Sequence, residues 1–536
     1  MKKFILCGMM LGLYWSSVFS LVRHQSFKEM ITDEEQRNRN PIELCHSIIS
    51  DIPECNFFCS NGNSITKDDF MQHTFLKKTP LLDVNEIFFL VRKITGVYQN
   101  HLLSKDARWV EEQVNDNIIQ TLAQGFYAQA FTVPNDATII VMGDYHGCAH
   151  SLARNILSLH KDEIIDEQGF LNPNNYLVFL GDLADRGFYG IECWALAILL
   201  KLKNPHNVII LQGNHECDRI YKTGGLAAEF EYKYPNSPSY IDASATIRFG
   251  FAFFFSLLPQ MCFIGTKSND QAPYCFVQYC HGGIHTFAKP QSQEIFQDLA
   301  GFETQAEFEQ LMSEYLDVEN LLLEALCTGP AQPSYLLVPK GPRLSGCTWN
   351  GFYANISGTI YGKRKGSRGI DVLIHGREVL SYLEKISIPG LCHIQGIVRG
   401  HDHMMNPIAW LHPFFSNTYQ CQIQQSWKPV IYDPLKPDKL EDARHARLLL
   451  FTDEQHGYPV CTITSLASLQ KTDAYGMITF DPFSQAWLLT PHIRRTPFCA
   501  PELTSRAYWS YSDVCGHRDH ELINLHLINP PAQESQ

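Results

Sequence analysis

The sequence has no excess of positive charge, no paired CxxC motif, and no apolar run beyond its N-terminus that could cross a membrane. Its 43 Lys and Arg stand against 56 Asp and Glu, which gives a formal net charge of −13. Because proteins that follow nucleic-acid phosphates carry clustered cations, we expect no nucleic-acid partner. Without paired CxxC spacing, the 17 cysteines predict no thiolate zinc site, and disulfides remain open.

What the chain does contain is typical of a folded enzyme. Hydrophobic residues make up 45% and charged residues 18% of the 536 positions, which excludes disorder of the whole chain. At about 100–200 residues per domain, this length predicts two to four domains, or one large domain with insertions.

The N-terminus resembles a secretory signal peptide. Lys2 and Lys3 precede an uncharged stretch, residues 4–22, in which small residues near Ser20 offer a cleavage site. We therefore expect residues 1–20 to be removed, the protein to be exported, and no stable membrane span to remain. The alternative is a membrane anchor formed by residues 4–22, because that stretch is close to the roughly 20 residues that cross a bilayer.

Helical and mixed regions follow one another along the chain. Residues 21–135 are predicted to be mostly helical, since apolar residues recur at helical spacing over 88–97 and 110–122. From residue 136, short β-branched runs alternate with helical stretches, which predicts an α/β core over residues 136–492. Three further segments complete the predicted organisation: insertions at about 284–346 and 404–457, and a C-terminal tail at 493–536.

Five of the β-branched runs share one feature, a polar loop directly after the strand. They are Thr138–Met142, Tyr176–Leu180, Val208–Gln212, Phe276–Cys280 and Ile394–Val398. Strands of this kind end at a common edge of an α/β sheet, and binding sites form there. We therefore expect the five loops to build one site.

The loops carry carboxylates, imidazoles, an amide and guanidinium groups. They read Gly-Asp-Tyr-His-Gly from residue 143, Gly-Asp-Leu-Ala-Asp-Arg-Gly from 181, Gly-Asn-His-Glu from 213, His-Gly-Gly from 281 and Arg-Gly-His from 399. Any one of them could be an ordinary turn, because Gly and Asp favour turns. Together, their mixed oxygen and nitrogen donors favour two divalent cations of the Mn, Fe or Zn kind. Such a pair polarises phosphoryl groups, which points to phosphoester hydrolysis.

These five motifs, in this order, resemble the signature of the PPP family of metal-dependent phosphoprotein phosphatases, within the calcineurin-like metallophosphoesterases. The resemblance extends to Phe253–Pro259, to the Arg-Gly context at 367–370, and to a stretch like the family's C-terminal β-hairpins at 460–491. It therefore covers roughly 135–492. It implies an α/β (α+β) fold, a β-sandwich flanked by helices, here with a helical N-terminal region and two insertions.

The resemblance also implies a two-metal centre. One ion would be held by Asp144, His146 and Asp182, and the other by Asp182, Asn214, His281 and His401. Asp182 would bridge the two ions, because a carboxylate has an oxygen for each. We expect Mn²⁺, with Fe or Zn as alternatives.

Catalytic roles follow from the same resemblance. His215 would protonate the leaving-group oxygen, and Asp185 would orient and charge its imidazole. Arg186 and Arg368 would bind phosphate oxygens, with Asn214 beside them. Hydrolysis would proceed by direct attack of metal-bound hydroxide. Arg368 has an alternative reading as part of an ordinary basic loop.

The chain departs from the family pattern at three places. His401 is followed by His403, as in the GHxH motif of the wider superfamily, where the second histidine is a metal ligand; we expect that His403 is not. The family's tyrosine-bearing loop is replaced by Ser-Leu-Ala-Ser-Leu-Gln at 465–470. The two insertions and the helical N-terminal region lie outside the family core, which suggests an unusual substrate specificity. Apart from these departures, Cys148 and Cys217 lie beside metal motifs, and we expect them to be passive.

The predicted function is hydrolysis of phosphoserine or phosphothreonine in proteins, with phosphotyrosine open. The signal-like N-terminus suggests an exported bacterial enzyme that acts on host proteins. One alternative is a small-molecule phosphohydrolase for dinucleoside polyphosphates or phosphodiesters. The other is an inactive scaffold that binds a partner.

Overall fold

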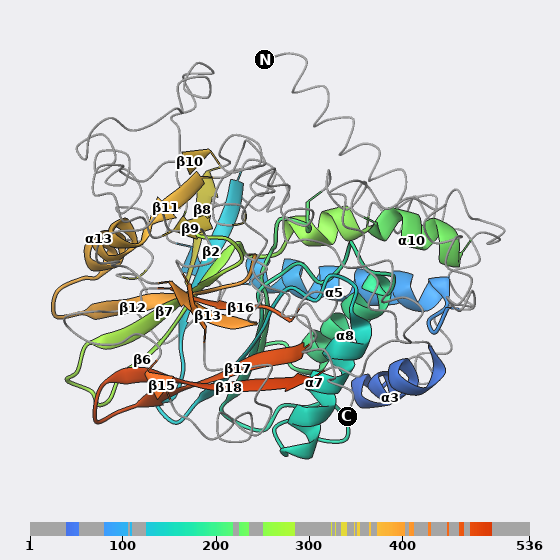
Figure 1. Ribbon diagram of the computed structural model, residues 1–536, viewed down its shortest axis with the longest axis horizontal. Helices are drawn as coiled ribbons and strands as arrows, with labels where there is room; N and C mark the ends of the chain where they lie inside the picture. Colours follow the sequence, from blue (N-terminus) through green and yellow to red (C-terminus); the bar gives the residue numbers. More distant parts are fainter. Residues whose placement is uncertain are drawn as a thin grey trace, which may run out of the picture.

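Two β-sheets packed against each other form the centre of the computed structural model (Figure 1). The structure describes residues 39–52, 80–104, 108–109, 125–217, 225–234, 250–284, 323, 327, 334–339, 348, 351–353, 364–365, 372–401, 407–411, 427–429, 448–449, 460–465 and 472–495. Side chains from both sheets meet in one buried cluster that includes Val141, Val277 and Trp487. This is the interior of a β-sandwich.

The first sheet combines a parallel half with an antiparallel half. In spatial order its strands are β15 (Leu448–Leu449), β18 (Ala486–Arg495), β17 (Thr472–Asp481), β3 (Thr138–Met142), β4 (Asn175–Phe179) and β5 (Val208–Ile210). The strands β3, β4 and β5 run parallel, so their carboxyl ends lie at one edge. The hairpin β17–β18 begins within the stretch 460–491, whose sequence resembled the family's C-terminal hairpins, and ends four residues beyond it.

The second sheet is larger. In spatial order its strands are β1 (Arg108–Trp109), β8 (Ser334–Pro339), β2 (Gly125–Thr132), β6 (Met261–Thr266), β7 (Tyr274–Cys280), β12 (Cys392–Arg399), β16 (Val460–Ile463), β13 (Ile408–Leu411) and β14 (Trp427–Pro429). The strands β7, β12 and β16 are parallel. A small third sheet contains β10 (Arg364–Lys365), β11 (Val372–His375) and β9 (Gly351–Tyr353).

All five motif-bearing strands are confirmed, as β3, β4, β5, β7 and β12. Three lie in the first sheet and two in the second, so the polar loops come from both layers of the sandwich. The predicted mixed α/β sandwich flanked by helices is confirmed as well. On its outer side, the second sheet is covered by α13 (Gly376–Ile386), whose Val379 and Ile386 are buried against it.

Several strands of the second sheet lie outside the segments that the sequence assigned to the core. The region predicted as helical, 21–135, ends in strand β2, which pairs with β6 and β8. Its sequence, Gly-Phe-Tyr-Ala-Gln-Ala-Phe-Thr, lacks the β-branched run of the other strands, but its aromatic residues favour a strand that pairs with two neighbours. The strands β8, β13 and β14 lie within the predicted insertions, yet they extend the second sheet. The helix predicted at 110–122 lies outside the described residues.

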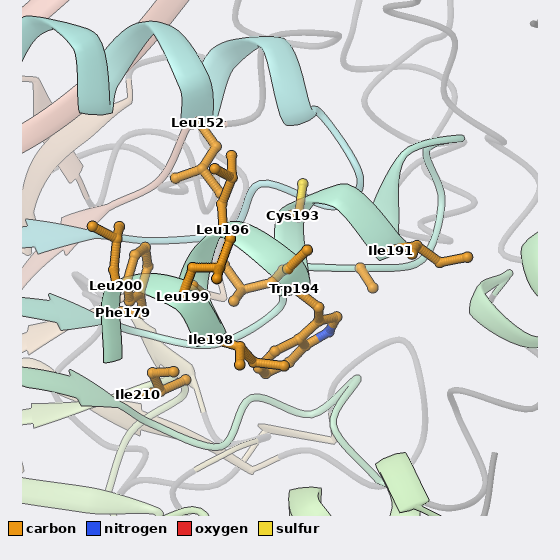
Figure 2. Close-up of a cluster of buried hydrophobic side chains, with 14 of the residues drawn as sticks. Leu152, Phe179, Ile191, Cys193, Trp194, Leu196, Ile198, Leu199, Leu200 and Ile210 are labelled. Carbon is orange, nitrogen blue, oxygen red and sulfur yellow. The ribbon is translucent and has the colours of Figure 1, made fainter. Parts of the chain in front are cut away.

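The N-terminal helices share a hydrophobic core with the first sheet. Helix α3 (Pro41–Asp51) begins with Asn40 as N-cap, and α5 (Val84–Leu103) begins with a capping box from Asp83 and Glu86. They pack on α7 (Ala149–Lys161) and α8 (Gly190–Lys203). Figure 2 shows part of this core around Trp194 of α8. By packing, these helices belong to the same unit as the sheet.

Two further observations bear on the sequence predictions. The ten cysteines in the described part of the chain are all free thiols, Cys148 and Cys217 among them. Among the helices that the structure describes, none is both long enough and apolar enough to cross a membrane. The predicted signal peptide and the tail 493–536, apart from its first three residues, lie outside the described residues.

Candidate metal centre

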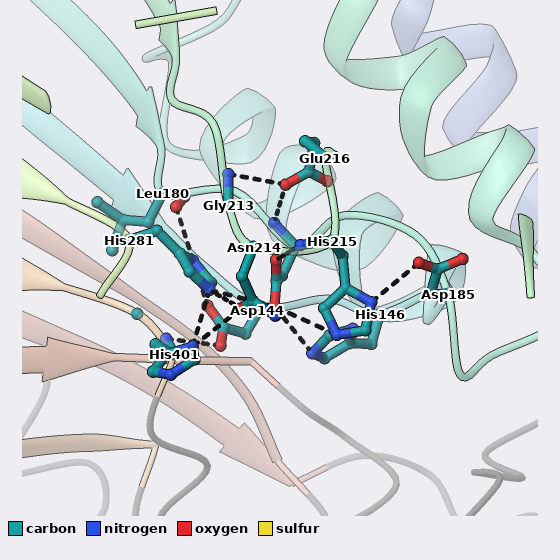
Figure 3. Close-up of polar contacts among 12 residues, drawn as sticks. Asp144, His146, Leu180, Asp185, Gly213, Asn214, His215, Glu216, His281 and His401 are labelled. Atoms are coloured by element: carbon teal, nitrogen blue, oxygen red, sulfur yellow. Dashed lines mark hydrogen bonds and ion pairs between the residues drawn. The ribbon is translucent and has the colours of Figure 1, made fainter. Parts of the chain in front are cut away.

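The polar loops of both sheets converge on one buried site (Figure 3). Asp144, Asp182 and Asn214 lie two, three and four residues after the ends of β3, β4 and β5 in the first sheet. His281 and His401 follow β7 and β12 of the second. All five side chains are at most 8% exposed. The site therefore lies across the carboxyl edges of two different sheets.

The backbone at the site is locally strained. Nine non-glycine residues in the described chain have positive φ. Six of them are predicted site residues: Asp144 (52°), His146 (45°), Asp182 (53°), Asp185 (69°), Arg186 (64°) and His401 (69°). A left-handed conformation costs a non-glycine residue on the order of 1–3 kcal/mol. The surrounding fold must offset this cost, and in return it aims the side chains into the site.

Close backbone approach makes glycine necessary at two positions beside the donors. A Cβ on Gly213 would collide with carboxylate oxygens of Asp182 and Glu216. A Cβ on Gly400 would collide with the carboxylate of Asp144. The glycines of two motifs therefore leave room for carboxylates to approach the backbone.

The first group of donors gathers around His281. Its Nδ1 lies 3.0 Å from the carbonyl oxygen of Leu180, so Nδ1–H donates there and Nε2 faces the site. Nε2 lies 2.9 Å from Asn214 Oδ1 and 3.1 Å from Asp182 Oδ2. His401 Nδ1 lies 2.9 Å from the same amide oxygen and 3.3 Å from His281 Nε2. These atoms point electron pairs at one small volume, which suits a cation.

The second group gathers around His146 and shares Asp182. His146 Nδ1 lies 3.1 Å from the carbonyl oxygen of Ala184, which directs Nε2 toward Asp182 Oδ2 at 3.4 Å. Asp144 Oδ2 accepts the N–H of His401 at 2.8 Å. Donor atoms of His146, Asp182 and His215 also lie within 4.8 Å of one another. The two donor groups share Asp182, and the residues present fit divalent cations; which residue would bind which ion stays a prediction.

The charges of the carboxylates depend strongly on the imidazoles. Burial alone would raise the pKa of Asp182, but the positive charges of neighbouring histidines hold it well below its usual value. Burial, together with the charge of Asp182, raises the pKa of Asp144 to about 7. Burial lowers the pKa of His281, yet the two carboxylates more than offset this and raise it to about 9. A cation that binds at Nε2 of His281 would therefore have to displace a proton.

Binding of Mn²⁺ is therefore expected to weaken as the pH falls. His281, with a pKa of about 9, must lose its proton to become a ligand, and Asp144, with a pKa of about 7, must be ionised. Below pH 9 the dissociation constant should rise about tenfold per pH unit, and more steeply below pH 7. Calorimetry at several pH values measures both the affinity and the protons released. An affinity that stays constant from pH 9 to pH 6 would contradict this linkage.

His215 lies beside the metal donors and is oriented by an aspartate. Its Nδ1 lies 2.9 Å from Asp185 Oδ2, while the other oxygen of Asp185 accepts the N–H of Leu226 at 2.7 Å. Its Nε2 lies 3.0 Å from Arg186 Nη2. Its backbone N–H donates to Asp182 Oδ1 at 2.9 Å. The predicted acid, its orienting carboxylate and one predicted phosphate-binding arginine are thus brought together. Arg368 and His403 lie outside the described residues.

Glu216, the last residue of the Gly-Asn-His-Glu motif, has a structural role that the sequence did not predict. Its buried carboxylate accepts the N–H groups of Asp182 and Gly213 at 2.8 Å each and that of Leu183 at 3.2 Å. Burial, together with the charge of Asp182, raises the pKa of Glu216 to about 8. Glu216 therefore holds two motif loops together. Its position six residues after β5 was visible in the sequence, but its inward direction was not.

Comparison with known proteins agrees with this geometry. Residues 137–405 match the calcineurin-like phosphoesterase family. A serine/threonine-protein phosphatase 4 catalytic subunit from Kluyveromyces lactis is 31% identical over 140 residues, 23% of this chain and 42% of the relative. The serine/threonine-protein phosphatase PP1-delta of Caenorhabditis elegans is 37% identical over 128 residues, 23% of this chain and 39% of the relative. The matched region thus spans less than half of each relative.

A solved structure resembles the chain over most of its length. It is a protein serine/threonine phosphatase from Saccharomyces cerevisiae with similarity to human phosphatase PP5. The sequences are 14% identical, the TM-score is 0.42, and the alignment covers 86% of this chain and 97% of that one.

The resemblance to phosphoprotein phosphatases is confirmed by these sequence relatives. The family match contains all five motif loops, and it covers about half of the 536 residues. The chain belongs to the calcineurin-like phosphoesterase family.

Proposed function

We propose that the protein is a metal-dependent phosphatase that hydrolyses phosphoserine and phosphothreonine in proteins. The observation that carries this proposal is the pair of donor groups sharing Asp182, with the His215–Asp185 pair directly beside them. His215 Nε2 lies 3.9 Å from Asp182 Oδ2, so an acid and the metal donors face the same small volume. Phosphatase relatives support the choice of a protein substrate.

The site residues have separate tasks in this reaction. Two bound divalent cations, Mn²⁺ in our proposal, would supply the positive charge that polarises the phosphoryl group and the acidity that ionises a water molecule. Arg186 carries a guanidinium whose geometry suits two phosphate oxygens. His215 delivers a proton to the leaving oxygen from Nε2, because Asp185 accepts the hydrogen bond from Nδ1. Asp185 also keeps the imidazole fixed in this direction.

Phosphate release from peptides tests the proposal. Residues 24–536 would be assayed with Mn²⁺ on phosphoserine, phosphothreonine and phosphotyrosine peptides, with diadenosine tetraphosphate alongside. We expect metal-dependent turnover of phosphoserine and phosphothreonine peptides that stops when a chelator removes the metal. Turnover of the nucleotide alone would favour a small-molecule phosphohydrolase. Bound metal without turnover of any substrate would favour an inactive scaffold that binds a partner.

We also propose export, with host phosphoproteins as substrates. This part is supported only by the signal-like residues 1–22. N-terminal sequencing of the protein from its native source tests it. An intact N-terminus on cytosolic protein would exclude export.

A further inference from the structure

Tyr145 is a buried phenol in the loop that carries Asp144 and His146. It lies between these two residues in the chain, and its side chain is fully buried. Both neighbours have positive φ, 52° and 45°. The loop therefore depends on contacts that hold it in an unfavourable backbone conformation.

The hydroxyl group of Tyr145 lies in a closed ring of hydrogen bonds. Asn155 of α7 donates to it from Nδ2 at 2.8 Å, and Ser465, after β16, hydrogen-bonds to the same hydroxyl. Asn155 Nδ2 also donates to the carbonyl of Ala474 in β17 at 3.1 Å. The ring closes because the N–H of Ala474 donates to Ser465 Oγ at 3.0 Å. One hydroxyl thus links the metal loop to three other segments.

The ring is itself anchored on two sides. The N–H of Ser465 donates to the carbonyl of Gly143 at 2.8 Å, directly before Asp144. Arg494 of β18 donates to Asn155 Oδ1 at 2.9 Å. The partners of the phenol are therefore fixed by the hairpin β17–β18 and by the loop's own backbone.

We propose that Tyr145 is a positioning residue, which sets the directions of Asp144 and His146 through the backbone of their shared loop. The inference rests on the proposed metal-dependent function. Buried partners that orient metal ligands commonly change metal affinity 10–100-fold when they are lost. Tyr145 has the geometry for this effect, because it lies within one residue of two predicted ligands and its hydroxyl is tied to three segments.

Tyr145→Phe tests the inference, because it removes one hydroxyl group and keeps the buried aromatic side chain. Tyr127→Phe is the matched control: Tyr127 is 2% exposed and its hydroxyl donates to Leu257 at 2.8 Å, outside the metal loops. Both variants should lose comparable thermal stability. The Mn²⁺ dissociation constant, measured by calorimetry, should rise about tenfold in Tyr145→Phe and less than about twofold in the control.

The outcomes separate this inference from the proposed function. Unchanged Mn²⁺ affinity in Tyr145→Phe, or an equal loss in both variants, would overturn the positioning role. If Tyr145→Phe does not fold, Ser465→Ala removes a hydrogen bond to the same hydroxyl and gives the deciding affinity. Failure of the unsubstituted protein to bind Mn²⁺ would instead overturn the proposed function.

Discussion

Asp182→Asn is expected to lower kcat/KM for phosphopeptides by about 10⁴-fold. Asp182 Oδ2 lies 3.1 Å from His281 Nε2 and 3.4 Å from His146 Nε2, so it belongs to both donor groups. An amide cannot offer an anionic oxygen to each of two cations, and losing several kcal/mol of metal-derived stabilisation corresponds to a factor of this size. Steady-state assays with saturating Mn²⁺ measure the loss. A variant that retains a tenth of the activity would contradict a shared-ligand role.

His215→Asn supplies the comparison that makes this result specific. If His215 protonates the leaving group, its loss should matter much more for phosphoserine peptides than for p-nitrophenyl phosphate, whose leaving group needs no proton. Asp182→Asn should reduce turnover of both substrates alike. Glu192→Gln is a control for a buried carboxylate elsewhere, since Glu192 binds Lys233 at 2.6 Å, away from the metal donors.

Removing the helices α3 and α5 is expected to abolish folding. Between residues 42 and 102, twelve buried side chains belong to the same core as α7, α8 and the first sheet. Burial of one such side chain contributes about 1.5–3 kcal/mol. Half of their sum, about 9–18 kcal/mol, is comparable to the whole 5–15 kcal/mol by which ordinary domains are stable. We therefore expect a chain that begins at residue 105 to show no cooperative thermal unfolding.

A chain that begins at residue 24 is the control, because it keeps both helices. Calorimetry and circular dichroism compare the two proteins. Cooperative unfolding of the shorter chain with an unchanged Tm would show that the N-terminal helices form a separate module. Ile94→Ala gives a graded version, since Ile94 is fully buried and its truncation should cost about 2–5 kcal/mol.

The motif strands could be predicted because each combines a β-branched run with an immediate polar loop. Thr138–Met142 is an example: it is a strand in the structure with the bounds expected from sequence. The convergence of the loops followed from the rule that parallel strands end at one edge. That rule does not foresee that His281 and His401 come from a second sheet, and only the packing of the sandwich shows it.

Other features depend on contacts that no local pattern carries. Strand β2 is formed by pairing with β6 and β8, neither adjacent to it in sequence. The sequence motifs contain Glu216 and Tyr145 but do not indicate a role for either. Their roles come from the N–H groups and side chains that surround them in the fold. The sequence also could not predict that α5 and α8 share one hydrophobic core. A helical period identifies an apolar face without naming what covers it.

The origin of the donors in two sheets also has a mechanical consequence. A metal ion held by Asp182 of the first sheet and His401 of the second would act as a cross-link between the layers of the sandwich, comparable in topology to a disulfide. Any sliding of one sheet over the other would pull the ligands apart. In this family member, activity would therefore require that the two sheets keep their relative position.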